Sequence, residues 1–210
     1  KGYIVTEKET GNELEIDNEY IMSPKDLCTI GFLNKIIDSG VRVLKIEGRA
    51  RGPEYVKKTC QIYNKALEAL ETNSYTNENI EIWKRELSTV FNRGFWDGYY
   101  LGQRLGEWSN VYGSKATHSK AYIAKVTNYF SNINVIELKI ESGSLSVGQK
   151  VMIIGPTTGV YEFVIEEIRV ENKSVAKAVK GNVISVPTKE LVRRGDKLYA
   201  FVENETIKIS

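Results

Sequence analysis

The sequence predicts an α/β region with flanking helices, followed by a small β-barrel. Apolar residues recur at helical spacing in three segments before residue 92, and a β-branched apolar run lies between the first two. From residue 121 onward, short apolar runs are separated by turn residues, a pattern typical of a small barrel. A stretch with few periodic apolar residues lies between these regions, so we expect a boundary near Gly113 and two domains, residues 1–113 and 114–210.

Composition narrows the class of protein. The chain is 41% hydrophobic and carries a net charge of +2, from 29 basic and 27 acidic residues. No apolar run approaches the roughly 18 residues of a membrane span, and the N-terminus has no signal-peptide pattern, so we expect no membrane partner. Two cysteines without paired spacing favour a reducing cytoplasm over a disulfide framework. The mild basic excess permits contact with nucleic acid but does not argue for it.

The chain begins with a predicted hairpin and a strand end. Residues 3–5 and 14–16 are apolar and flank a polar stretch that contains Gly11, which predicts two strands joined by a longer loop. A short strand end is expected near Ile21.

A capped helix is predicted next. Ser23 suits the N-cap, Pro24 suits the first helical position, and Gly40 suits the residue after the last turn. This start would place Cys28 in the first or second turn, where the helix dipole favours a thiolate.

Residues 41–49 are then expected to form a parallel strand, because their first half is β-branched and apolar. At period two, Lys45, Glu47 and Arg49 share one face near the end of this strand. Sites in βα folds are built at the carboxyl ends of strands, so this charged trio is a candidate catalytic group. A solvated strand end with a Lys–Glu pair is the alternative.

Two longer helices and a loop follow. The helix over residues 54–71 has an apolar face that includes Cys60, which we interpret as a buried structural thiol. Thr76 or Asn77 can cap the next helix. Residues 91–100, FNRGFWDGYY, form a glycine-punctuated aromatic loop. It either covers the end of a barrel or binds substrate, with Arg93 on an anion and Trp96 stacked on a ring.

The final region is expected to be a β domain with a binding or supporting role, because it shows no catalytic constellation. Its predicted strands are residues 122–130, 135–140, 150–154, 161–170, 174–179, 183–186 and 198–202. The phrases GSLSVGQKV at 143–151 and VRRGDKL at 192–198 resemble the second domain of translation elongation factors.

The sequence contains few residues that could form a catalytic or metal site without help from another chain segment. The single histidine, His118, has no nearby residue to orient it and is interpreted as a surface residue. No CxxC or HExxH spacing occurs, which excludes the usual self-contained zinc motifs. Cys28 is the remaining candidate for chemistry.

Three motifs in order carry a family resemblance: MSPKDLC at 22–28, KIEGR at 45–49 with PEYV soon after, and FNRGFWDGYY at 91–100. This pattern resembles the collagenase-like peptidase family U32. The resemblance implies that residues 1–113 are the last units of a (βα) barrel with flanking helices, followed by a small elongation-factor-like β-barrel. It also implies that the chain is the C-terminal part of a longer protein, with the rest of the barrel upstream.

The resemblance offers two functions. Several family members hold an iron–sulfur cluster with four cysteines and help to hydroxylate a tRNA base. Cys28 matches the last of the four ligands, while the other three would lie upstream, so no cluster is expected in this piece alone. RNA would then be the partner, and Lys45, Glu47 and Arg49 would line the barrel mouth. The alternative is a collagenase-like peptidase acting on a peptide substrate, in which Glu47 needs partners from upstream. In isolation, the piece is expected to be an inactive structural and binding module.

Overall fold

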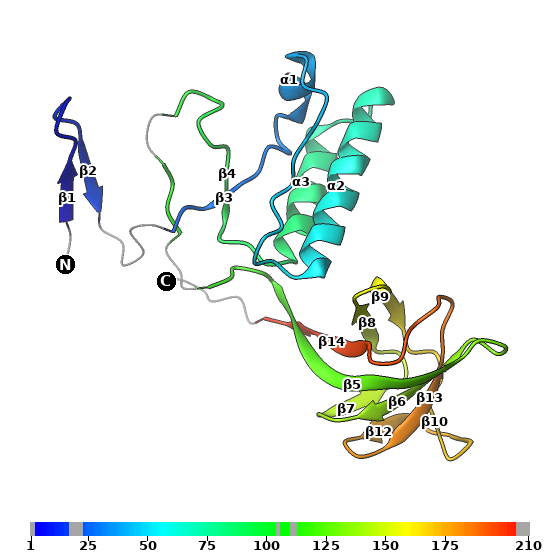
Figure 1. The fold of residues 1–210 in the computed structure, drawn as a ribbon. Coiled ribbons are helices and arrows are strands. Elements are labelled where there is room, and N and C mark those ends of the chain that lie inside the picture. The colour runs from blue at the N-terminus through cyan, green and yellow to red at the C-terminus, as the bar shows by residue number, and fades with distance from the viewer. Residues whose placement is uncertain (1–2, 17–22, 104–105, 110–112, 205–210) are drawn as a thin grey trace. The chain divides into compact units, whose positions relative to one another are not determined.

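A computed structural model describes residues 3–16, 23–103, 106–109 and 113–204 (Figure 1). The fold is mixed α/β with a large antiparallel sheet. It divides into two compact units, the first formed by residues 1–47 and 58–116 and the second by residues 48–57 and 117–210. The predicted strand end at Ile21 lies outside the described residues. Within the described part of the chain, no helix is long and apolar enough to cross a membrane.

The first unit opens with the predicted hairpin. Strands β1 (Tyr3–Thr6) and β2 (Glu13–Ile16) pair antiparallel, with Tyr3 opposite Ile16. Gly11, with φ of 71°, lies in the connection, where a residue without a Cβ adopts this conformation most readily.

The predicted start of the next helix is wrong. Residues around Asp26 instead form β3 (Asp26–Leu27), which pairs parallel with β4 (Phe95–Trp96), and helix α1 begins only at Leu33 (Leu33–Asp38). The reason is tertiary. The N–H of Lys25 donates to Glu107 O at 2.9 Å and that of Asp26 donates to Gly94 O at 2.8 Å. The predicted end is correct, because Gly40 has φ of 96° and its N–H donates to Ile37 O.

The strand predicted over residues 41–49 is also wrong. These residues belong to no strand or helix, and Val43 is 83% exposed. A strand needs at least one hydrogen-bonded neighbour, and none pairs with this segment among the described residues. Side-chain exposure still alternates along this segment, although it is not paired in a sheet. Leu44 and Ile46 are half-buried, while Lys45 and Glu47 are exposed.

Two longer helices form most of the first unit's core. Helices α2 (Pro53–Glu71) and α3 (Asn77–Ser88) lie side by side (Figure 1). Of the two predicted caps, Thr76 and not Asn77 caps α3, by accepting a hydrogen bond from the N–H of Asn79. The buried face of α2 differs from the prediction, because Cys60 is only half-buried and Ile62 is fully buried. The buried residues of the two helices are Thr59, Ile62, Ala66, Ala69, Ile80, Trp83 and Leu87.

The second unit is built from short strands. They are β5 (His118–Phe130), β6 (Val135–Ile140), β7 (Ser144–Ser146), β8 (Lys150–Gly155), β9 (Gly159–Val164), β10 (Arg169–Val170), β11 (Lys173–Ser174), β12 (Lys177–Val179), β13 (Val183–Pro187) and β14 (Lys197–Glu203). Eight of them form one sheet in the order β11-β10-β13-β6-β5-β14-β8-β9, and β12 pairs separately with β7. The strand predicted over residues 161–170 is two strands, β9 and β10, and that over 174–179 is β11 and β12.

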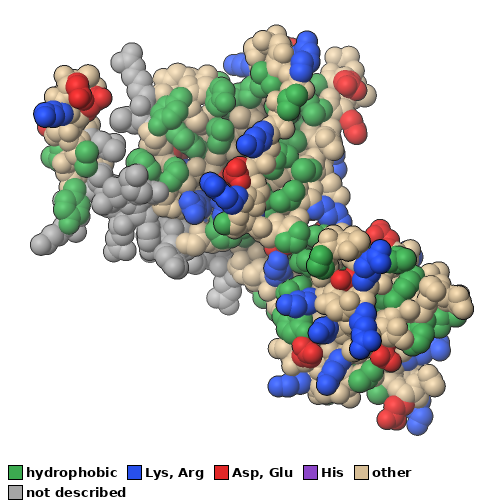
Figure 2. All heavy atoms as spheres, in the orientation of Figure 1, with side chains coloured by type: hydrophobic (Ala, Val, Ile, Leu, Met, Phe, Trp, Pro, Cys, Tyr) green, Lys and Arg blue, Asp and Glu red, His purple; other side chains and the backbone are tan. Residues whose placement is uncertain are grey.

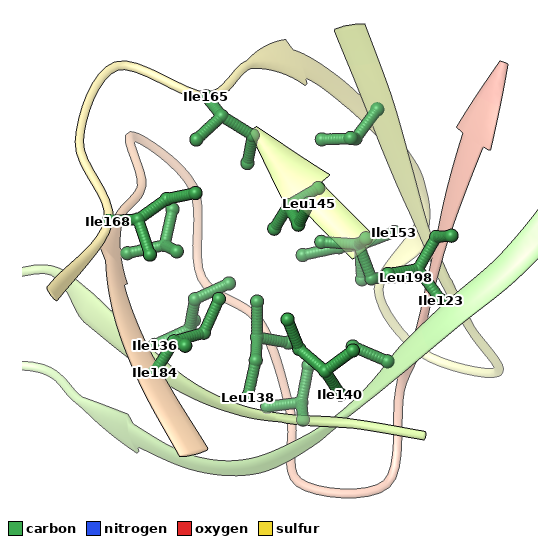
Figure 3. Packing of buried hydrophobic residues seen from close by; sticks show 14 of the residues in the cluster. Ile123, Ile136, Leu138, Ile140, Leu145, Ile153, Ile165, Ile168, Ile184 and Leu198 are labelled. Atoms are coloured by element: carbon green, nitrogen blue, oxygen red, sulfur yellow. The ribbon is translucent and has the colours of Figure 1, made fainter. Parts of the chain in front are cut away.

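The core of the second unit lies on the inner face of this sheet. Ile136, Leu138 and Ile140 alternate along β6 and are fully buried, which is the pattern of a strand with one face against a core. Figure 3 shows these side chains meeting Leu145, Ile153 and other apolar residues in the space that the strands surround.

Candidate functional site

The β3–β4 pair brings three predicted site residues together: Cys28, Arg93 and Trp96. The N–H of Cys28 donates to Trp96 O at 2.9 Å, and the N–H of Arg93 donates to Asp26 Oδ2 at 3.1 Å. Arg93 and Trp96 are half-buried, and Cys28 is 7% exposed. Sequence motifs almost 70 residues apart therefore meet in one small region of the first unit.

A buried asparagine holds the turn before β4. Asn92 is 2% exposed. Its amide Nδ2 donates to Val90 O at 2.9 Å, and its Oδ1 accepts from the N–H of Gly94 at 3.0 Å. Gly94 follows with φ of 85°, a conformation that glycine adopts without strain. Sequence reasoning missed Asn92, although an asparagine two residues before a glycine is a turn signal.

Cys28 is packed in the apolar core of the first unit. It belongs to a core cluster with Ile30 and Leu33. The hydroxyl of Tyr63, from α2, accepts from the N–H of Thr29, the residue after Cys28, at 3.1 Å. Burial raises the pKa of Cys28 from its ordinary value of 9.0, more strongly than the hydrogen bonds from Ile30 N–H and Tyr63 lower it. Burial likewise raises the pKa of Tyr63 to about 12.

The predicted thiolate at a helix start is therefore wrong for this fold. Cys28 precedes α1 by several residues, and desolvation favours the neutral thiol. The structure can also be compared with the ligands that an iron–sulfur cluster needs, which are four cysteines. Among the described residues, no group of three or more His, Cys, Asp or Glu side chains could hold a metal ion. The residues of this chain do not fit a cluster by themselves, because Cys28 would supply one ligand.

Aromatic side chains continue from β4 onto the surface. Trp96 meets Tyr99 edge to face with ring centroids 5.2 Å apart, and Phe32 meets Tyr100 at 5.9 Å. Tyr99 and Tyr100 are 61% and 65% exposed, while Phe32 is buried. The half-buried Trp96 and the buried Phe32 therefore contact two exposed tyrosines, and this surface can stack on a planar or proline-rich ligand.

The charged trio lies on the extended segment after α1. Lys45, Glu47 and Arg49 are all exposed, as a shared outward face requires. Lys45 and Glu47 belong to the first unit and Arg49 to the second. His118 lies at the start of β5, half-buried, with its Nδ1 2.9 Å from Thr117 Oγ1. No catalytic triad forms around it among the described residues.

Comparison with known proteins identifies the family. Residues 1–110 match peptidase family U32, and the chain belongs to this family. It is 58% identical over 205 residues to a protein named collagenase from Porphyromonas gingivalis, covering 98% of this chain and 50% of that protein. It is 32% identical to an uncharacterised protease of Methanocaldococcus jannaschii, covering 97% of this chain and 50% of that protein.

A more distant relative carries a different name. The tRNA hydroxylation protein P1 of Bacillus subtilis is 31% identical over 163 residues, covering 73% of this chain and 36% of that protein. The chain thus spans about half the length, or less, of the curated relatives it matches.

Proposed function

We propose that this chain is part of a collagenase-like peptidase, in which it supplies a catalytic carboxylate together with substrate-binding and supporting residues. One observation carries the proposal: the 58% identity to the Porphyromonas gingivalis collagenase extends over 98% of this chain. We also propose that β3, α1 and β4 are the last units of a (βα) barrel, and that the second unit is an elongation-factor-like barrel. The parallel pairing of β3 with β4 supports the first of these assignments.

The proposed roles follow from exposure and chemistry. Glu47 is exposed on an extended segment and is the carboxylate we assign to general-base or metal-assisted hydrolysis, with partners from the rest of the protein. Lys45 and Arg49 would stabilise negative charge beside it. Trp96 and Arg93 would bind the peptide, because proline-rich extended chains dock on aromatic surfaces.

The test is gelatin digestion by the whole protein. We expect cleavage of gelatin, and we expect Glu47→Gln to reduce kcat at least 100-fold with unchanged thermal stability. Glu81→Gln is the matched control, because Glu81 is an exposed carboxylate on α3 that forms an ion pair with Lys84 in the same helix. Intact gelatin with the parent protein, or equal rates for both variants, would refute the peptidase assignment to Glu47.

A second candidate function is iron–sulfur-dependent tRNA hydroxylation, favoured by the presence of Cys28 at the end of the MSPKDLC motif. Cys28 is the residue that the family resemblance assigns to a cluster ligand, and a bound metal would have to offset the burial that raises the pKa of its thiol in this structure. Similarity to the Bacillus subtilis tRNA hydroxylation protein P1 adds support. In this proposal Cys28 is one ligand and the other three come from the remainder of the protein.

Iron and sulfide determination on the anaerobically purified whole protein tests this second function. We expect Cys28→Ser to lose iron and sulfide together, and the matched variant Cys60→Ser, at a half-buried position on α2, to keep both. Absence of iron from the parent protein would exclude the cluster and leave the peptidase proposal standing.

A further inference from the structure

A row of three lysines crosses the outer face of the large sheet in the second unit. Lys125 on β5 lies directly opposite Lys197 on β14 and, on its other side, opposite Lys139 on β6. All three are exposed, while their chain neighbours Ala124, Val126, Leu138 and Leu198 point into the core. Neighbouring strands lie about 4.8 Å apart, so the row spans about 10 Å.

A bulge brings aromatic rings onto the same face. Residues 122 and 125 would face opposite sides of a regular strand, but the register between β5 and β14 shifts between Leu198 and Tyr199. Tyr122 is consequently opposite Tyr199, and their rings meet edge to face with centroids 5.7 Å apart. Lys197, Tyr199 and Phe201 alternate along β14, so lysines and aromatic rings interleave on this face.

This arrangement costs stability within the protein. Like charges directly opposite each other in a sheet are unfavourable. The two flanking lysines have carboxylate partners, Lys120 with Glu54 at 2.6 Å and Lys150 with Glu162 at 3.3 Å. None of the three lysines in the row forms an ion pair in the part of the chain that the structure describes.

The acidic groups around the row have other partners. Glu137 lies two residues before Lys139, and its Oε1 accepts from Thr127 Oγ1 at 2.6 Å. Glu141 accepts a hydrogen bond from the hydroxyl of Tyr122. An anion from outside the protein would meet Lys125 and Lys197 as a directly opposed pair, with Lys139 beside them between these two carboxylates. Lys and Arg side chains gather on the visible face of this unit in Figure 2.

We propose that the outer face of β5, β6 and β14 binds single-stranded nucleic acid. The row of lysines would contact successive phosphates, and Tyr199 beside it would stack on a base. A row of positive charges alone could bind any polyanion. Proteins that bind single-stranded nucleic acid combine such charges with aromatic rings on which the bases stack. The inference rests on the second unit alone and holds whichever chemistry the whole protein performs.

Fluorescence anisotropy with a labelled single-stranded RNA, using the full chain, tests the proposal. We expect the triple variant Lys125→Gln/Lys139→Gln/Lys197→Gln to bind at least 10-fold more weakly than the parent. The matched control is Lys173→Gln/Lys177→Gln/Lys180→Gln, which removes the same charge from exposed lysines outside the row. It should bind within about 3-fold of the parent. Circular dichroism of each variant verifies folding.

Salt dependence provides an independent measure. Each phosphate contact on a single strand contributes about 0.7 to the slope of log K against log salt, so losing three contacts should reduce the slope by about 2. Tyr199→Leu should weaken RNA binding about 10-fold while leaving the salt slope unchanged.

Two results would overturn the proposal: equal losses in the two triple variants, or binding of a sulfated polysaccharide as tight as RNA and independent of Tyr199. Neither result bears on gelatin cleavage, so a failure here is distinguishable from a failure of the proposed peptidase function. Single-stranded DNA of the same sequence determines whether the 2′-hydroxyl contributes.

Discussion

The two units differ in how far apart in the sequence their decisive contacts lie. In the second unit, β6 runs over the predicted residues and pairs with β5 through a short turn. In the first unit, the segment around Cys28 is organised by Phe95 and Trp96, which come much later in the chain. Alternation and turn residues are local signals, so they predict the second unit well. The candidate site depends on distant pairing, which no local pattern encodes.

The largest expected difference between the two units comes from a cavity-forming substitution in the core of the second unit. Leu138 is fully buried in the second unit, so Leu138→Ala should destabilise that unit by about 2–5 kcal/mol. All three tryptophans, Trp83, Trp96 and Trp108, belong to the first unit. Urea unfolding followed by tryptophan fluorescence should therefore remain unchanged, while circular dichroism of the β unit shifts to lower urea. A shift in both signals would mean that the units unfold together.

The next largest loss of stability is expected where the backbone of Gly155 lies close to the side chain of Asp196. A Cβ on Gly155 would lie 1.8 Å from Oδ1 of Asp196, a buried carboxylate that accepts hydrogen bonds from Thr158 and from the N–H of Arg193. Gly155→Ala should cost about 1–3 kcal/mol, because the buried Asp196 side chain would have to move away from its hydrogen-bond partners. Gly31→Ala in the first unit is the control, since its Cβ would make only ordinary contacts with Lys84. Equal melting temperatures for the two variants would contradict the expectation.

The hydroxyl of Tyr63 provides a test of the stability of the first unit. Tyr63→Phe removes the acceptor of the Thr29 N–H and should destabilise this unit by about 1–2 kcal/mol. Tryptophan fluorescence is the measurement. Tyr161→Phe, which removes the acceptor of the Lys189 N–H in the second unit, should leave that signal unchanged. If instead Tyr161→Phe lowers the fluorescence midpoint and Tyr63→Phe does not, the assignment of these contacts to separate units is wrong.

A smaller effect is expected from alkaline pH. The raised pKa of Cys28 means that the folded first unit keeps a proton that the unfolded chain loses above about pH 9. Its contribution to stability is therefore complete below pH 9 and is lost as pH rises through the folded pKa. Urea titrations between pH 8 and pH 10 should show a steeper decline for the parent than for Cys28→Ser. Parallel declines would show that Cys28 is not the group responsible.

The smallest expected change in stability comes from reversing one charge in the lysine row. Lys125→Glu replaces two like-charge pairs with two opposite-charge pairs, so it should stabilise the second unit by about 0.5–1 kcal/mol at low salt. The gain should shrink in 0.5 M salt because screening weakens exposed pairs. Lys177→Glu is the control, since Lys177 lies opposite Ser146. Thermal unfolding measures both, and destabilisation by Lys125→Glu would contradict the predicted repulsion.

Sequence patterns anticipated much of the molecule. The hairpin of β1 and β2, the cap at Thr76, the stop at Gly40 and the position of β6 were all predictable from neighbouring residues. The family was predictable from three short motifs, and the family match over residues 1–110 confirms it. The roles of Lys45, Glu47 and Arg49 stay predictions.

The errors in the first unit share one cause. Ser23, Pro24 and Asp26 make a good helix start in isolation, but the backbone from Lys25 to Cys28 bonds to residues 94–107 instead. Those bonds move the start of α1 to Leu33 and bury Cys28, which reverses the expected direction of its pKa shift.

The family, most of the strands and the exposure of Lys45 and Glu47 follow from residue types and short spacings, so they could be predicted from the sequence. The surroundings of Cys28 and the row formed by Lys125, Lys139 and Lys197 depend on contacts between distant segments, and they became known from the structure. Strand register explains this difference. Strand pairing and a single bulge determine which side chains share a face, and both arise between segments that local sequence does not connect.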